Sequence, residues 1–177
     1  MKQKLFSVRE LVFIALFAAV IAISAWIAIP AAIPFTLQTL SVFACTGILG
    51  LKCSLAATVT YILLGLVGLP VFAGFQGGIG VLLSVTGGYI LGFIPAVLVC
   101  GILMQHFGKK MTGCIICMTL GLVTCYLFGS LWFFLLHKAA FLSALTSCVL
   151  PFIPFDIIKI LLAAVITFKV RKHICLK

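Results

Sequence analysis

Two charged side chains stand three residues apart in an otherwise apolar stretch near the end of the chain. In PFIPFDIIK, residues 151–159, Asp156 is one of only two acidic residues among 177, and Lys159 follows it. On a helix this spacing places both side chains on one face, and Pro154 suits a first helical turn, where the dipole favours an anion. The two residues can form an internal ion pair, or they can bind a polar ligand that needs one acceptor and one cation. The spacing alone leaves both interpretations open.

The composition around this pair is that of a membrane protein. Hydrophobic residues make up 65% of the chain and charged residues 8%, and the mean hydropathy is +1.43. These values lie far outside the range of water-soluble domains. We therefore expect residues 1–177 to form a single integral membrane domain, in which an ionisable residue within a span is a functional candidate by default.

Hydrophobic runs of membrane-spanning character recur along the whole chain. We expect an all-α protein with six transmembrane helices, over residues 11–29, 37–51, 54–69, 86–105, 112–136 and 154–168. The first run ends at a proline and lacks a small-residue cleavage site, so we interpret it as a retained helix and not as a secretory signal. Residues 70–85 are rich in glycine, and we expect them to line or cover a cavity.

The positive charges indicate the orientation of these helices. Most cationic residues fall at the two chain ends or in the turns after even-numbered runs: Lys2, Lys4, Arg9, Lys52, Lys109, Lys110, Lys169, Arg171, Lys172 and Lys177. On the opposite side only Lys138 is charged. We therefore expect both termini to be cytoplasmic. The net charge of +10 then reflects topology and attraction to anionic lipids, and not nucleic-acid binding. Asp156 and Lys159 would lie near the extracellular side, where burying a charge costs less.

Small residues in the first run could allow another helix to approach closely. Ala15 and Ala19 are four residues apart, and Ala18 and Ala22 repeat the step. Such spacing is found both in packing within a subunit and in docking of a partner helix, and both alternatives remain open here.

Patterns typical of metal, nucleotide or catalytic sites are missing from the sequence. Cys114 and Cys117 form a CxxC without the second ligand pair of a structural zinc site. The three histidines lack HExxH spacing, and no GxxxxGK[ST] loop is found. Because no nucleophile has a paired base and no second acidic residue lies in a span, we expect neither an enzyme nor a protein with a metal or a cofactor.

Three segments together resemble a known family. IPFTLQTL (33–40), GLPVFAGFQGGIGVLLSVTGGYILGF (68–93) and PFIPFDIIK (151–159) are similar, in order and spacing, to the signature segments of the BioY family. This family comprises the biotin-specific substrate-binding S components of energy-coupling factor (ECF) transporters. The chain departs from the usual GPTGGY of the family, because Ser84, Val85 and Thr86 precede Gly87, Gly88 and Tyr89. We expect this departure to affect the local geometry of that turn and not the resemblance as a whole.

The resemblance implies a six-helix protein that captures biotin from outside and delivers it inward with a transmembrane coupling subunit and two cytoplasmic ATPases. Lys159 would bind the biotin carboxylate or the ureido carbonyl, and Asp156 the ureido nitrogens. The family motifs add further candidate contacts, with three phenylalanines as apolar walls: Thr36, Gln38, Gln76, Thr86, Gly87, Gly88, Tyr89, Phe35, Phe72 and Phe75.

For the first helix, the resemblance implies that Ala15, Ala18, Ala19 and Ala22 contact the coupling subunit. A stand-alone, proton-coupled transporter of biotin or a related vitamin, with Asp156 as the proton relay, is the alternative. Proton-gradient dependence of uptake in cells without coupling proteins would favour that alternative.

Overall fold

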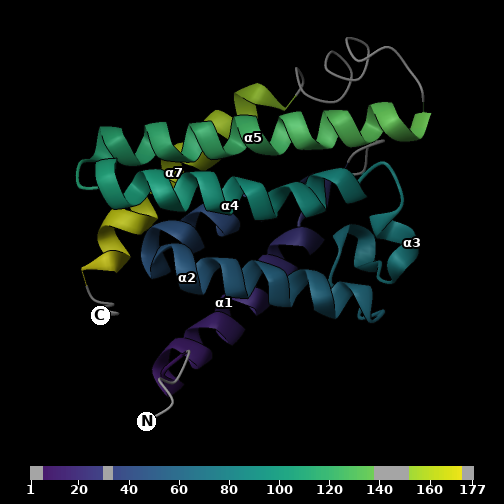
Figure 1. The fold of residues 1–177 in the computed structure, drawn as a ribbon, viewed down its shortest axis with the longest axis horizontal. Coiled ribbons are helices and arrows are strands. Elements are labelled where there is room, and N and C mark those ends of the chain that lie inside the picture. The colour runs from purple at the N-terminus through teal and green to yellow at the C-terminus, as the bar shows by residue number, and fades with distance from the viewer. Residues whose placement is uncertain (1–5, 30–33, 138–151, 173–177) are drawn as a thin grey trace.

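The structure, a computed structural model, describes residues 6–29, 34–137 and 152–172, and it is built mainly from long helices (Figure 1). The helices are α1 (Val8–Trp26), α2 (Gln38–Leu66), α3 (Ile79–Leu82), α4 (Gly87–Phe107), α5 (Met111–His137) and α7 (Ile153–Arg171), with a 3-10 turn over Ala73–Phe75. The strands β1 (Ala28–Ile29) and β2 (Phe35–Thr36) pair in an antiparallel ribbon. The helical class agrees with the sequence prediction, whereas the ribbon was not predicted.

The longest helix, α2, consists of two antiparallel halves. At Gly50 the backbone has φ 76° and ψ 173°, a conformation outside the helical range that glycine adopts without a steric penalty. The side-chain amide of Gln38 donates a hydrogen bond of 2.6 Å to the hydroxyl of Tyr61, 23 residues further on. In a straight helix these residues would lie about 35 Å apart, so the chain must reverse at Gly50. This reversal lies next to the break predicted between residues 51 and 54.

The first helix is displaced towards the N-terminus by three residues relative to the predicted run. The backbone N–H of Glu10 donates to Ser7 Oγ (3.2 Å), and the backbone N–H of Ser7 donates to Glu10 Oε2 (2.7 Å). This capping box starts the helix at Val8. The helix ends at Trp26, because the chain then bends into the ribbon, where the backbone N–H of Leu37 donates to the carbonyl groups of residues 24 and 27.

The helices pack around α2, which contacts α1, α4 and α7, while α4 lies along α5 (Figure 1). The core between them consists of small and apolar side chains, among them the fully buried Phe43, Tyr61 and Val97. Within the described residues, α1, α4 and α5 are each long and apolar enough to cross a membrane, and α2 is so with its two halves counted together. The chain is therefore a multi-pass membrane protein.

The two ends of the helical bundle differ in character. At one end, Lys52 Nζ lies 4.6 Å from the ring centroid of Phe6, and Arg171 donates to the carbonyl of Gly108 at 3.4 Å. These contacts join the start of α1 to the α2 reversal, and the end of α7 to the α4–α5 turn. Cationic residues therefore collect at this end.

The other end carries the ribbon, the 3-10 turn and α3, and two tryptophans stabilise it. The indole N–H of Trp26 donates to the carbonyl of Pro70 (2.9 Å), and that of Trp132 donates to the carbonyl of Ser84 (3.2 Å). Tryptophan is enriched at membrane interfaces, where its ring is buried and its N–H finds an acceptor. The glycine-rich segment is thus tied to α1 and α5 at this end of the bundle.

Candidate ligand-binding site

The charged pair lies in the first turns of α7, at the end of the bundle that carries the ribbon and α3. Asp156 is 2% exposed and Lys159 is 6% exposed, and the ammonium group lies 2.8 Å from Asp156 Oδ1. Pro154 has no backbone N–H, so it suits a first turn, where donors lack partners within the helix, and Asp156 occupies the same turn. The two residues therefore form a buried ion pair on one helix face, as the spacing predicts.

Two further helices supply donors to the carboxylate of Asp156. The hydroxyl of Thr39, at the start of α2, donates to Oδ1 at 3.0 Å, and the hydroxyl of Tyr126 on α5 donates to Oδ2. An unpaired buried charge costs several kcal/mol, about 3–5 when one partner of a buried pair is removed. The three donors offset that cost, so Asp156 joins α2, α5 and α7 at one point.

Lys159 has an aromatic partner as well as its carboxylate partner. Its ammonium group lies 4.0 Å from the ring centroid of Phe35 on β2, close enough for a cation–π interaction. The ring of Phe35 in turn stacks on Phe152 with centroids 5.1 Å apart, and it meets Phe155 edge-on at 4.9 Å. The ribbon is thereby held against the start of α7, over the ion pair.

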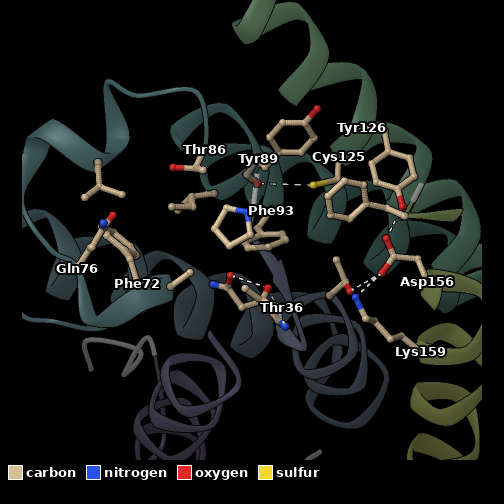
Figure 2. A pocket seen from close by; sticks show the side chains of 17 residues that line it. Thr36, Phe72, Gln76, Thr86, Tyr89, Phe93, Cys125, Tyr126, Asp156 and Lys159 are labelled. Carbon is tan, nitrogen blue, oxygen red and sulfur yellow. Dashed lines mark hydrogen bonds and ion pairs between the residues drawn. The ribbon is translucent and has the colours of Figure 1, made fainter. Parts of the chain in front are cut away.

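The ion pair faces a pocket between the ribbon, α2, α4, α5 and α7. About 750 Å³ of free space lies between its walls, including the part that opens to solvent. Seventeen residues line it: Pro34, Thr36, Gln38, Thr39, Phe72, Ala73, Gln76, Val81, Thr86, Tyr89, Ile90, Phe93, Cys125, Tyr126, Phe152, Asp156 and Lys159. In Figure 2, Gln76 and the Asp156–Lys159 pair lie on opposite sides of the pocket, with Phe93 between them.

A chain of polar side chains continues along the floor of the pocket. Thr36 Oγ1 donates to the side-chain carbonyl of Gln38 (2.9 Å), and the Gln38 amide donates to Tyr61 (2.6 Å). Both ends of the Gln38 amide are therefore fixed in orientation. A preorganised polar group of this kind, within mostly apolar walls, gives a pocket its specificity.

Most of the site residues predicted from the sequence meet in this pocket, and four do not line it. Those that line it are Thr36, Gln38, Phe72, Gln76, Thr86, Tyr89, Asp156 and Lys159. The ring of Phe35 contacts the ammonium group of Lys159 but does not line the pocket. Phe75, predicted to form an apolar wall, does not line this pocket: it is 64% exposed and stacks on Trp26 with ring centroids 4.9 Å apart.

Gly87 and Gly88 were predicted to contact the ligand, but in the structure they allow close packing beside the pocket. A Cβ atom on Gly87 would overlap the backbone carbonyl of Leu82, and one on Gly88 would overlap the side chain of Trp132. These glycines therefore let α4 approach α3 and α5. They determine where the neighbouring Thr86 and Tyr89 stand in the pocket wall.

The turn before these glycines explains how the chain accommodates its departure from the GPTGGY pattern. Ser84 Oγ donates to the carbonyl of Val81 (2.6 Å) and lies 2.9 Å from Thr86 Oγ1. Serine and threonine hydroxyls commonly stabilise turns through such local bonds. Side-chain hydrogen bonds thus hold this turn where the family pattern has glycine and proline.

Several pocket residues were not predicted from the sequence. Thr39 belongs to the IPFTLQTL segment, and Tyr126 is a polar side chain inside the long apolar run 112–136, so both carried a signal that could have been used. Cys125, Phe93 and Phe152 also line the pocket. Phe93 and Phe152 also belong to the segments that resemble the family, whereas Cys125 is of a residue type ordinary for membrane helices and carried no such signal.

The arrangement suits a small molecule with polar groups at both ends and an apolar middle. One end of the pocket offers a carboxylate and an ammonium group, and the other offers the neutral side chains of Gln76 and Thr86. Aromatic side chains, such as those of Phe72 and Phe93, supply apolar contact area between them.

A glycine outside the pocket wall determines the position of one of these rings, which leads to a prediction about stability. A Cβ atom on Gly65 would overlap the ring of Phe72, which is 1% exposed and packs edge-on against Tyr61. We expect Gly65→Ala to lower the free energy of unfolding by about 1–3 kcal/mol, the usual cost of overpacking, as measured by thermal unfolding in detergent. Gly80→Ala is the matched control, since no atom lies within 4 Å of its added carbon. Equal stability of both variants would show that Gly65 does not fix this ring.

Comparisons with known proteins show the family of this chain. The sequence pattern of the BioY family matches residues 1–175. The biotin transporter BioY of Thermotoga maritima is 38% identical over 172 residues, which cover 93% of this chain and 96% of the relative. A probable biotin transporter BioY of Pyrococcus horikoshii is 35% identical over 164 residues, with coverage of 92% and 96%.

A solved structure shares the fold as well as the sequence pattern. It is the crystal structure of the S-component for biotin from an ECF-type ABC transporter, with a TM-score of 0.87 and 29% identity. The match covers 93% of this chain and 92% of that chain. The resemblance inferred from the three sequence segments is thereby confirmed, and the chain belongs to the BioY family.

Proposed function

We infer that this chain is the biotin-binding S component of an ECF-type ABC transporter and that biotin binds in the pocket beside Asp156 and Lys159. The observation that carries this inference is the buried ion pair at one end of an otherwise mostly apolar pocket. The fold around it matches that of the S-component for biotin. Biotin joins a polar ureido ring to a carboxylate through an apolar ring and chain, so its polarity pattern matches that of the pocket.

The charges favour one orientation of biotin in this pocket. The ureido group has two N–H donors and one carbonyl acceptor, so it complements the acceptor Asp156 and the donor Lys159 together. A carboxylate at the same place would meet the like charge of Asp156 at close range. At the opposite side, Thr86 directly precedes α4, whose N-terminus favours an anion. We therefore place the ureido ring at the ion pair and the carboxylate near Thr86 and Gln76.

The proposed topology has six membrane passes, with both chain ends in the cytoplasm. The two halves of α2 would cross separately, because the chain reverses at Gly50, and α1, α4, α5 and α7 supply the other four. The basic end of the bundle, with Lys52 and Arg171, would face the cytoplasm by the positive-inside rule. The biotin pocket at the other end would then open towards the outside of a bacterial cell membrane, and residues 1–177 would act as one domain.

The partners in this proposal are a transmembrane coupling subunit and two cytoplasmic ATPases. The sequence has no phosphate-binding loop of its own, so ATP would act only through those subunits. Asp156 accepts hydrogen bonds from Lys159, Thr39 and Tyr126. Both oxygens of Asp156 are thus held in a network that joins three helices, an arrangement that suits a fixed ligand site.

Uptake of labelled biotin in cells that lack all other biotin transporters tests this source of energy. We expect uptake when the chain is expressed with coupling and ATPase subunits, and loss of uptake when the ATPases carry inactivated phosphate-binding lysines. Uptake that persists without the ATPases and collapses with the proton gradient would contradict the ECF mechanism and favour the stand-alone transporter.

A further inference from the structure

A second pocket lies at the basic end of the bundle, between the α4–α5 turn and the end of α7. Its walls are formed by Gly108, Lys109, Phe168, Arg171 and Lys172, and about 630 Å³ of free space lies between them, including the open part. Three of these five residues are cationic, and none is acidic. Biotin capture does not require this pocket, since it lies at the end of the bundle away from Asp156.

We propose that this basic pocket binds the phosphate headgroup of an anionic membrane lipid. Its three cations have no carboxylate side chain of this chain as a counter-ion. The chain contains only two acidic residues; Glu10 is bonded in the capping box of α1, and Asp156 is bonded to Lys159. Like-charged side chains around one cavity repel each other, and a bound anion removes that repulsion.

The donors in the pocket match the chemistry of a phosphate. A guanidinium group has five N–H donors, and the one described bond of Arg171, to the carbonyl of Gly108, uses one of them at 3.4 Å. Arginine binds phosphate through paired N–H groups, and lysine adds a flexible charge. The helix α5 begins at Met111, two residues after Lys109, so the positive end of its dipole lies next to the pocket and favours an anion.

The location favours a lipid over a soluble anion or an acidic protein segment. The cations stand at the ends of the long apolar helices α4 and α7, which is the depth at which lipid headgroups lie. Phe168 adds a half-buried apolar wall to the pocket, which can contact the glycerol and the first acyl carbons of a lipid. Basic pockets between transmembrane helices on the cytoplasmic side are known to bind anionic headgroups.

Native mass spectrometry of the purified full chain tests this proposal. With equal amounts of phosphatidylglycerol and phosphatidylcholine added, we expect the unmodified protein to retain phosphatidylglycerol preferentially. The pocket variant Lys109→Gln, Arg171→Gln, Lys172→Gln should bind phosphatidylglycerol at least about tenfold more weakly. The control variant Arg9→Gln, Lys52→Gln, Lys169→Gln removes the same number of exposed charges from outside the pocket, and it should keep most of that affinity.

Several outcomes would overturn the proposal. If the unmodified protein showed no preference for phosphatidylglycerol over phosphatidylcholine, the proposal would be wrong whatever the variants do. An equal loss of phosphatidylglycerol affinity in the pocket and control variants would show that the lipid is attracted by the overall positive charge and not bound in the pocket. Displacement of the lipid by inorganic phosphate would assign the pocket to a free anion. Retention of the lipid by the pocket variant, with loss of the coupling subunit on co-purification, would assign it to a protein contact. Biotin binding should persist in both variants, which verifies that they are folded.

Discussion

Biotin binding will weaken at least tenfold, by about 1.4 kcal/mol, when Asp156 is replaced by Asn and, in a separate variant, when Lys159 is replaced by Ala. Each substitution removes one of the two groups that the proposed site offers to the ureido ring, and it leaves the other buried charge without its partner at 2.8 Å. Titration of the purified variants with biotin gives the affinities. Lys169→Ala is the matched control, because Lys169 lies on the same helix and is exposed.

A double variant separates binding from a structural role of the ion pair. Asp156→Asn with Lys159→Met removes both buried charges, so neither is left uncompensated, and replacement of buried pairs by neutral side chains is often tolerated. We expect this protein to insert and fold but to bind biotin at least as weakly as the single variants. Affinity close to that of the unmodified protein would reduce the pair to a bridge that only holds α7 in place.

Transport, as distinct from capture, should depend on the exposed alanines of α1. Ala15 and Ala19 lie on the exposed side of the helix, whereas Ala18 and Ala22 are buried in the core, with exposures of 2% and 7%. The proposed docking face is therefore reduced to Ala15 and Ala19. Replacing both by tryptophan should abolish biotin uptake and co-purification with the coupling subunit, since bulky side chains prevent close helix approach. Biotin binding by the isolated protein should stay within about twofold of normal, because the site is formed by other elements.

Ala18→Trp supplies the contrast on the same helix. Its side chain would have to enter a packed core, which is strongly destabilising, so this variant should lose stability and biotin binding together. If the variant with tryptophan at positions 15 and 19 also lost biotin binding, the exposed alanines would be needed for the fold. The docking proposal would then be wrong.

The sequence was sufficient to predict the helical class and the position of the ion pair. A hydrophobic run long enough to span a membrane is decided by local composition, and a spacing of three residues on a helix places Asp156 and Lys159 on one face whatever surrounds them. The break between residues 51 and 54 was also predicted, and it lies next to the reversal at Gly50, with the charged Lys52 in the predicted turn.

Features that depend on contacts between distant segments were not predicted. The three donors to Asp156 come from three helices, and only packing in three dimensions brings Thr39 and Tyr126 to the same carboxylate. Phe75 lies within the glycine-rich stretch that was expected to line a cavity, but its ring is exposed and stacks on Trp26. The four alanines look equivalent in sequence, and the rotation of α1 against α2 distinguishes the buried pair from the exposed pair.

Release of biotin from the purified chain tests the central claim most directly. The protein is expressed without coupling subunits, saturated with biotin, washed free of unbound vitamin and then denatured, and the released biotin is measured against the amount of protein. The account predicts close to one biotin per chain for the unmodified protein, and a much smaller amount for the double variant of Asp156 and Lys159. Release of no biotin from the folded, unmodified chain would contradict it.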